Sequence, residues 1–246
     1  PKFIKFDKLN NNNATHIIPV SNETYNLILK YEKPNNRKIQ IINHGVNQNF
    51  FEEINNEKLS YYKKKYQLEN KIVIGTISRY VKSKGYEKII SAIQLLIKSY
   101  PNLKFLGVGY GPNEDYYKSL IKQSQLENHI ILTGKIPYED IPSIYRCLNI
   151  YIHAADYEPF GFVIAEAMFC KVPIISTKVG AAADKLEHLK SAYLLDSNNP
   201  EEIANAIKFM IENNTEQIII NAYKTAKENF SKEKMWYNYK KIFTEI

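Results

Sequence analysis

Short apolar runs and amphipathic stretches alternate along most of this chain. After residue 72, each apolar run is followed by a stretch in which apolar residues recur every three or four positions, as at Ile89, Ile93 and Leu96. The short runs are typical of buried strands, and the amphipathic stretches are typical of helices that cover a sheet. Strands separated by single helices predict an α/β fold: a Rossmann-like parallel sheet with right-handed crossovers and helices on both faces.

The strands of this sheet are predicted at residues 72–77, 103–108, 130–133, 150–154, 173–177 and 193–195. Helices are predicted at residues 59–68, 115–124, 141–147, 162–169, 200–211, 217–229 and 232–243, with one more between the first two strands. Ligands bind such sheets at the carboxyl ends of the strands. We therefore expect one crevice, surrounded by the loops that follow Ile77, Val108, Thr133, Ala154 and Thr177.

The first fifty residues carry a separate, shorter pattern. Residues 16–20 predict a strand, Ser21 an N-cap, the stretch up to Tyr31 a helix, and residues 39–42 a second strand. We therefore divide the chain into a strand-helix-strand unit at residues 1–50, a Rossmann-like domain at residues 51–230 and a closing helix at residues 231–246.

The composition is that of a folded protein with one sizeable core. Hydrophobic residues make up 44% and charged residues 24% of the 246 positions, a length too short for two full α/β domains. No apolar run approaches the roughly 20 residues that cross a bilayer, and the first residues have no secretory pattern. We expect a soluble, cytoplasmic protein.

The formal net charge of +7 raises the question of an anionic partner. The lysines are scattered without a basic stripe, which argues against nucleic acid and leaves peripheral contact with an anionic membrane surface as the alternative. Cys147 and Cys170 lack metal or redox spacing, and the five histidines lack the spacing of zinc ligands. We therefore expect no metal site.

The loop after the strand at 72–77 carries two cations. Arg79 lies at the end of the strand and Lys84 just before the next helix. A guanidinium contacts phosphate oxygens through two hydrogen bonds, and a lysine adds a point charge near backbone amides, so the pair suits a diphosphate. A solvated arginine and lysine at a helix start are also common, so this loop alone does not establish a diphosphate site.

Two loops that contain glycine follow the next strands. Gly109 lies in the segment 107–112, which is either a tight turn or a ligand-facing loop and lacks the spacing of the dinucleotide fingerprint. Lys135 and Ile136 follow Gly134 in a similar turn, whose exposed backbone could read the edge of a base.

The most informative segment is residues 158–168. Glu158 precedes a helix, and Gly161 at its first turn permits close approach of a ligand to the backbone. Glu166 interrupts the middle of this otherwise apolar helix, where an unpaired charge is costly. Something polar should therefore meet Glu166.

Together these motifs resemble the C-terminal donor domain of family 4 retaining glycosyltransferases, which have the GT-B fold. Glu158 and Glu166, with seven residues between them, match the glutamate pair that is the signature of that family. The loops at 78–85, 108–112 and 134 match in order and in phase with the predicted strands. The resemblance implies the C-terminal half of a GT-B fold. It also implies hexose transfer from a nucleoside-diphosphate sugar, with retained configuration and without metal or cofactor.

The resemblance also implies a role for each candidate residue. As catalytic residues, Arg79 and Lys84 would hold the donor diphosphate and offset the charge of the leaving group, and Glu158 would bind sugar hydroxyls. Glu166 would accept the two ribose hydroxyls. The other donor contacts would come from the backbone near Lys135 and Ile136 for the base, from Phe160, Gly161 and Phe162 for the sugar, and from Gly109 and Val163.

In this family the donor domain is one half of the enzyme. Residues 43–47 resemble the hinge, so residues 1–50 would be a remnant of the N-terminal acceptor domain, and this chain alone would lack the acceptor pocket. We expect as partners a UDP- or GDP-sugar donor, a glycan or lipid-linked acceptor, and the missing domain or a partner subunit. The closing helix and the unit before Gly45 would pack on each other or, by self-association, on a second copy.

Two other classes stay open. One is a catalytically inactive nucleotide-sugar-binding module or subunit, and the other is a different GT-B enzyme such as a sugar-nucleotide epimerase. The chain also departs from the family at Lys171, where a helix-ending glycine is typical. Lys171 should therefore adopt a positive φ or end its helix by another geometry.

Overall fold

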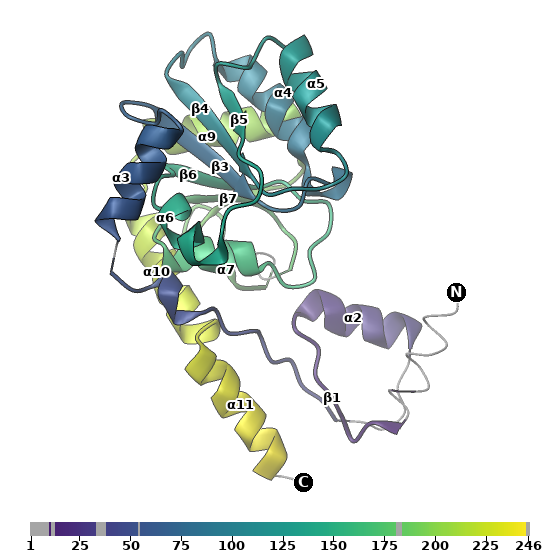
Figure 1. Ribbon diagram of the computed structural model, residues 1–246. Helices are drawn as coiled ribbons and strands as arrows, with labels where there is room; N and C mark the ends of the chain where they lie inside the picture. The colour runs from purple at the N-terminus through teal and green to yellow at the C-terminus, as the bar shows by residue number, and fades with distance from the viewer. Residues whose placement is uncertain (1–9, 11–12, 33–37, 54, 181–183, 245–246) are drawn as a thin grey trace.

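A parallel sheet of six strands forms the centre of the computed structural model (Figure 1). The structure describes residues 10, 13–32, 38–53, 55–180 and 184–244. All neighbouring strands in the sheet are parallel, which confirms the predicted fold class. The spatial order is β5-β4-β3-β6-β7-β8, and the strands are β3 (Ile72–Ile77), β4 (Leu103–Val108), β5 (Ile130–Leu132), β6 (Ile150–His153), β7 (Ile174–Thr177) and β8 (Tyr193–Leu195).

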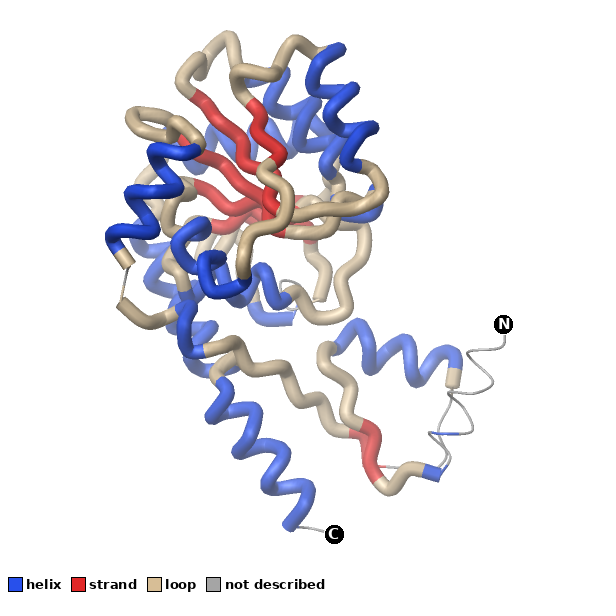
Figure 2. The backbone as a smooth tube through the Cα atoms, viewed as in Figure 1, coloured by secondary structure: helices blue, strands red, loops and turns tan. Residues whose placement is uncertain are grey.

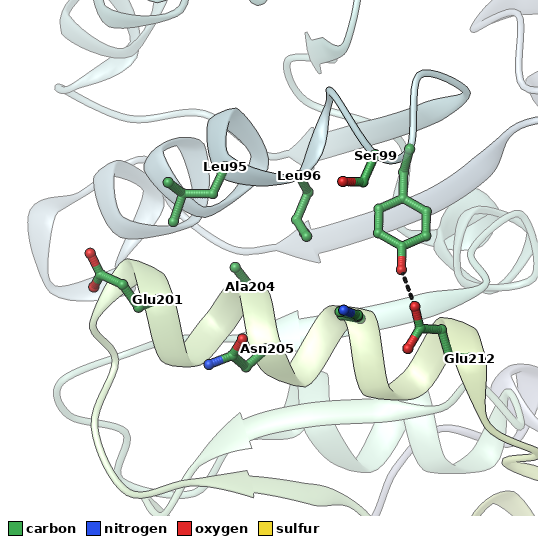
Figure 3. A pocket seen from close by; sticks show the side chains of 9 residues that line it. Leu95, Leu96, Ser99, Glu201, Ala204, Asn205 and Glu212 are labelled. Atoms are coloured by element: carbon green, nitrogen blue, oxygen red, sulfur yellow. Dashed lines mark hydrogen bonds between the residues drawn. The ribbon is translucent and has the colours of Figure 1, made fainter.

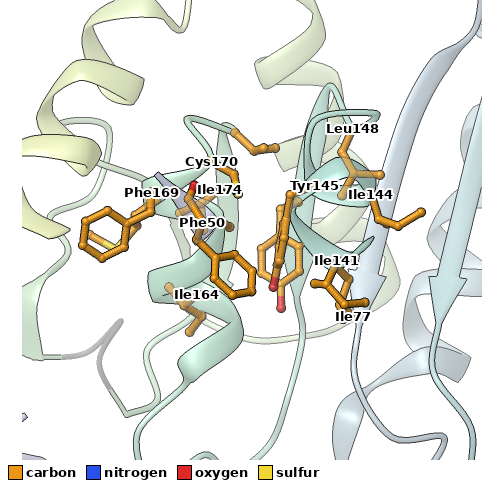
Figure 4. Close-up of a cluster of buried hydrophobic side chains, with 14 of the residues drawn as sticks. Phe50, Ile77, Ile141, Ile144, Tyr145, Leu148, Ile164, Phe169, Cys170 and Ile174 are labelled. Atoms are coloured by element: carbon orange, nitrogen blue, oxygen red, sulfur yellow. Dashed lines mark hydrogen bonds between the residues drawn. The ribbon is translucent and has the colours of Figure 1, made fainter. Parts of the chain in front are cut away.

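Helices cover both faces of this sheet, as Figure 2 shows. Its strands are rich in β-branched residues and are buried on both sides; in β3, for example, Val73 belongs to one core and Ile74 to the other. The core in Figure 4 lies under α3 (Asn56–Lys65), α6 (Ile141–Tyr145), α7 (Phe162–Phe169) and α10 (Glu216–Asn229). The opposite core lies under α4 (Tyr86–Leu96), α5 (Glu114–Gln123) and α9 (Pro200–Glu212).

The order of the strands reverses at β3. From β3 the chain proceeds outward through β4 and β5, and it then returns to form β6 on the other side of β3, where Ile74 pairs with Ile150. The connections that follow β3 and β6 therefore diverge from neighbouring strands. Such a switch point opens a crevice at the carboxyl ends of the strands.

A second, smaller unit precedes this sheet. The Ser21 side chain accepts a hydrogen bond from the Thr24 N–H at 3.2 Å, which confirms the predicted N-cap. Both strands of the unit are shorter than predicted, because Pro19 has no N–H to donate to the paired strand. The Pro19 carbonyl oxygen still accepts a hydrogen bond from the Ile42 N–H at 3.1 Å. The unit consists of β1 (His16–Ile17), α2 (Asn22–Tyr31) and β2 (Lys38–Ile39), and its two strands are parallel.

The closing helix α11 (Lys232–Thr244) starts against the segment that follows this unit and then extends away from the sheet (Figure 1). The Val46 N–H donates to the Phe230 carbonyl oxygen at 2.8 Å, and the Gly45 N–H contacts Met235 Sδ at 3.3 Å. Near the C-terminal end of α11, Phe243 is 70% exposed. None of the helices in the described ranges is long and apolar enough to cross a membrane.

Two details of the helices differ from or refine the prediction. Helix α3 begins at Asn56, three residues earlier than predicted, because the Asn55 side chain caps it by accepting from the Lys58 N–H at 2.9 Å. Lys171, after the end of α7, has a φ of +58°, which is the first of the two expected geometries, a left-handed backbone. Its Nζ also lies 4.8 Å from the centre of the Tyr223 ring.

We predict that Lys171→Gly melts at a higher temperature than Lys171→Ala. Both variants lose the contact with Tyr223, but only glycine relieves the left-handed strain, which costs roughly 1 kcal/mol for other residues. Thermal unfolding of the two variants, followed by circular dichroism, measures this difference. Equal melting temperatures would contradict the strain at Lys171.

Candidate active site

The crevice at the carboxyl edge of the sheet brings the predicted site residues into one region. Arg79 and Lys84 lie in the loop after β3, and Gly109 lies after β4. Lys135 and Ile136 follow β5, while residues 158–162 follow β6 and lead into α7. The predicted crevice therefore receives loops from four neighbouring strands.

An ion pair joins the loops that follow β3 and β6. Lys84 Nζ lies 2.6 Å from Glu158 Oε2, and the two side chains are only 15% and 16% exposed. Gly85, with a φ of +75°, allows this approach, since a Cβ at that position would overlap the carbonyl oxygen of Ala154. Removal of either charge would leave the other uncompensated in a mostly buried place.

His153, the last residue of β6, approaches the same carboxylate. Its Nε2 lies 3.8 Å from Glu158 Oε2, and the side chain is 2% exposed. Burial lowers the pKa of His153 to about 4, so the ring is neutral at neutral pH and the contact is not a salt bridge. Nε2 is buried and has no hydrogen-bond partner among the described residues.

An apolar cavity of about 320 Å³ lies beside Arg79. Tyr110 and Tyr138 contribute aromatic walls, and the side chain of Lys135 lies with its Nζ 5.7 Å from the centre of the Tyr110 ring. Within the described ranges, no carboxylate forms an ion pair with Arg79. The predicted site residues that line the cavity are Arg79, Gly109, Lys135, Ile136 and Val163.

Glu166, on α7, is not among the residues that line this cavity and is 6% exposed. The Tyr145 hydroxyl is 2.9 Å from Glu166 Oε2 and 2.9 Å from the Val163 carbonyl oxygen. This hydroxyl is the polar partner that the sequence requires for Glu166. Burial nevertheless raises the pKa of Glu166 to about 7, because one neutral hydrogen bond replaces little of the lost hydration.

The loop between β6 and α7 is held by aromatic packing. His44 stacks on Phe162 and meets Phe160 edge-on, both with ring centres 5.0 Å apart. Gly161 caps α7 with a φ of +88°, which leaves the first N–H groups of the helix facing the crevice end of the sheet. Segment 43–47, resembling a hinge, therefore packs directly on the loop predicted to hold the sugar.

The first turn of α2 docks on the same loop. The Ser21 hydroxyl donates to the Pro159 carbonyl oxygen at 2.6 Å, and the Asn22 N–H donates to Asp184 Oδ2 at 2.8 Å. Glu23 Oε2 accepts from the Gly180 N–H at 3.2 Å. These three bonds tie the small unit to two loops at the carboxyl edge of the sheet.

Four residues of this region were not predicted from the sequence. Tyr110 and Tyr138 follow β4 and β5, so their place after strand ends is a signal that could have identified them. Tyr145 lies on α6 and gives no such signal. His153 ends β6, but the histidines were weighed only as zinc ligands.

A larger cavity lies elsewhere, between α4 and α9 (Figure 3). It has a volume of about 760 Å³, and the Tyr100 hydroxyl bonds to Glu212 at 2.6 Å across one end. It holds none of the predicted site residues. The described part of the chain also has no cluster of three or more His, Cys, Asp or Glu side chains suited to a metal ion.

Comparison with known proteins decides the family. Residues 60–227, more than half of the chain, match the family of glycosyl transferases group 1. The chain belongs to this family. An uncharacterized glycosyltransferase of Methanocaldococcus jannaschii is 33% identical to this group 1 glycosyltransferase chain over 238 residues. The match covers 95% of this chain but 59% of that relative, so the chain spans less than two thirds of the relative's length.

Two solved structures share the fold of this group 1 glycosyltransferase chain. The C-terminal domain of LpcC, a glycosyl transferase group 1 family protein from Francisella tularensis, is 27% identical with a TM-score of 0.65. It covers 76% of this chain and 99% of its own, which confirms the predicted C-terminal half of a GT-B fold. The Anabaena protein HepE, in complex with UDP and glucose, is 24% identical with a TM-score of 0.88, covering 100% of this chain and 67% of its own.

We predict that Glu166→Gln stabilises the glycosyltransferase chain, relative to the wild type, more at pH 8 than at pH 5. A carboxyl whose pKa rises from 4.5 to about 7 on folding holds its proton more tightly when folded. Its contribution to stability is therefore fully present below pH 4.5 and is lost as pH rises through 7, by on the order of 2 kcal/mol between pH 5 and 8.

Urea unfolding at the two pH values measures this difference between Glu166→Gln and the wild type. Glu139→Gln, at an exposed position on the loop after β5, is the control and should leave the pH dependence unchanged. A pH-independent effect of Glu166→Gln would contradict the buried titration.

Proposed function

We propose that this chain is the donor-binding part of a retaining glycosyltransferase that transfers a hexose from a nucleoside-diphosphate sugar to a glycan or lipid acceptor. One observation carries the proposal: an apolar, partly aromatic cavity lies directly beside the Arg79 guanidinium at the switch point of a parallel sheet. The apolar cavity suits a nucleotide base, and the arginine beside it suits a diphosphate.

The base occupies the cavity in this proposal. Tyr110 and Tyr138 offer flat aromatic surfaces, and Ile136 and Val163 contribute apolar contacts. The backbone at Lys135 and Ile136 offers N–H and C=O groups to the edge of the base. A volume of about 320 Å³ is in the range of small-molecule sites.

The ribose and the diphosphate extend from the cavity toward the ion pair. Glu166 accepts the ribose hydroxyls, which supply hydrogen bonds that Tyr145 alone does not provide. Arg79 binds the diphosphate through two hydrogen bonds. Its guanidinium is available for these bonds, because no carboxylate of the described residues forms an ion pair with it. Lys84 adds a second cation after it leaves Glu158.

These groups also explain how transfer would proceed without a metal. Arg79 and Lys84 stabilise the negative charge that develops on the departing diphosphate, an electrostatic contribution of several kcal/mol. Glu158 binds hydroxyls of the sugar, and the N–H groups near Phe160, Gly161 and Phe162 hold it in place. The departing phosphate helps to deprotonate the acceptor on the same face, which retains the anomeric configuration.

A UDP-hexose is the donor that we would test first. HepE, whose fold this chain shares, has been solved with UDP and with UDP-glucose. A GDP-sugar is the second choice, because the cavity lining does not distinguish the two bases by charge.

Residues 1–50 are, in this proposal, a remnant of the acceptor domain with the hinge, residues 51–230 the donor domain, and residues 231–246 the crossover helix. The acceptor pocket would lie on the missing domain or on a partner subunit. The second candidate function is a nucleotide-sugar-binding subunit without activity of its own. Under either candidate function, this chain alone should bind a donor and transfer no sugar, because the proposal places the acceptor pocket on another domain or subunit.

We predict that Arg79→Lys weakens binding of UDP to the chain more than tenfold, because a point charge does not reproduce the two parallel bonds of a guanidinium. Isothermal titration calorimetry measures this loss. Lys82→Ala, an exposed cation in the same loop, is the matched control and should bind UDP as the wild type does.

Two outcomes would contradict the proposal. Failure of every nucleotide and nucleotide sugar to bind at millimolar concentration would exclude a donor site. Efficient transfer from UDP-glucose by this chain alone would refute the assignment of the acceptor pocket to a missing part.

A further inference from the structure

His153 is a buried polar group at the site that the proposed mechanism leaves unused. Its side chain is 2% exposed at the end of β6, and its Nε2 has no partner among the described residues. Buried ring nitrogens in native proteins almost always have a hydrogen-bond partner, so an unpaired one calls for an explanation. The atom that it faces is Glu158 Oε2, at 3.8 Å.

Lys84 and His153 both approach the same oxygen of Glu158. Lys84 Nζ lies 2.6 Å from Oε2, while His153 Nε2, at 3.8 Å, lies about 0.6 Å beyond the upper end of N–H···O hydrogen-bond distances. Within the described ranges, Glu158 has no other ion-pair partner. If Lys84 turns away, Glu158 therefore has one buried donor within reach of a small movement.

Donor binding supplies the reason for Lys84 to turn away. The ligand-free ion pair neutralises Lys84, yet the proposed function requires that cation at the diphosphate. Once Lys84 has moved, the Glu158 carboxylate would be mostly buried and without a cation, which is costly unless a hydrogen bond replaces it.

We propose that His153 is the positioning residue that takes over Glu158 when Lys84 engages the donor diphosphate, and that it holds the carboxylate in the orientation that binds the sugar. The inference rests on the proposed function. In the tautomer with its proton on Nε2, the neutral ring donates a hydrogen bond to Oε2. Glu158 thus exchanges one donor for another, and Lys84 is released without leaving a buried charge unpaired.

The exchange does not require a protonated histidine. Desolvation keeps the pKa of His153 well below its usual range, and Lys84 lowers it further while Glu158 opposes this. Tyr151, the aromatic ring that stacks on His153 with centres 6.5 Å apart, is neutral as well.

The test compares UDP with UDP-glucose by isothermal titration calorimetry on the full chain. His153→Phe and His153→Leu remove the donor, and His153→Gln restores an N–H at a similar reach. UDP already carries the diphosphate that draws Lys84 away from Glu158. We therefore expect the Kd for UDP to rise about tenfold in the Phe and Leu variants, as for loss of one hydrogen bond to a charged group, and the Kd for UDP-glucose to rise at least as much. Both values should return to within twofold of the wild type in the Gln variant.

A double-mutant cycle shows whether His153 acts through Glu158. In a Glu158→Gln background, His153→Phe should change either Kd by less than twofold, because the carboxylate that it positions is gone. Additive effects of the two substitutions would overturn the proposal.

Other outcomes are equally decisive. Unchanged Kd values in His153→Phe, or a loss that His153→Gln does not reverse, would assign His153 to folding alone. Failure of the wild type to bind UDP would instead remove the proposed function and this inference with it, so the two failures are distinguishable.

Discussion

The parallel pairing of β3 with β6 is the constraint on which the site depends. Because β3 also pairs with β4, the next segments of chain fill the other side of the sheet before β6 returns to lie beside β3. The loops after these two strands then meet, although they are far apart in the sequence. Lys84 and Glu158 lie 74 positions apart and nevertheless form a 2.6 Å ion pair.

The polar groups of this site are buried without full pairing, and a ligand would supply the missing partners. Glu166 has one neutral partner and a raised pKa, Lys84 is held by a carboxylate, and His153 leaves a nitrogen unpaired. Each of these arrangements costs stability compared with an apolar core of the same shape. A ligand with ribose hydroxyls, a diphosphate and sugar hydroxyls would satisfy all three together, which is the physical basis of the proposed function.

Much of the fold could be predicted from the sequence because its signals are local. The period of the apolar residues identifies strands and helices, and their alternation predicts the parallel sheet. The cost of a charge in an apolar helix predicts a polar partner for Glu166, which is Tyr145. Boundaries were less predictable where single residues decide them, as Asn55 does for α3 and Pro19 for β1.

The geometry of the site was less accessible to the sequence. That Glu158 is shared between Lys84 and His153 depends on distances of a few ångströms between separate strands, which no periodicity encodes. The docking of Ser21 on Pro159 depends likewise on how two units pack. Of the residues that the sequence did not identify, Tyr110 and Tyr138 carried a usable signal, which is their position after strand ends.

A crystal structure of this chain with UDP tests the central claim most directly. The account predicts the base between Tyr110 and Tyr138, the ribose hydroxyls at Glu166 and the diphosphate at Arg79, with Lys84 turned from Glu158 toward the phosphates. A nucleotide bound in the groove between α4 and α9, or one bound in the crevice with its diphosphate away from Arg79, would contradict it.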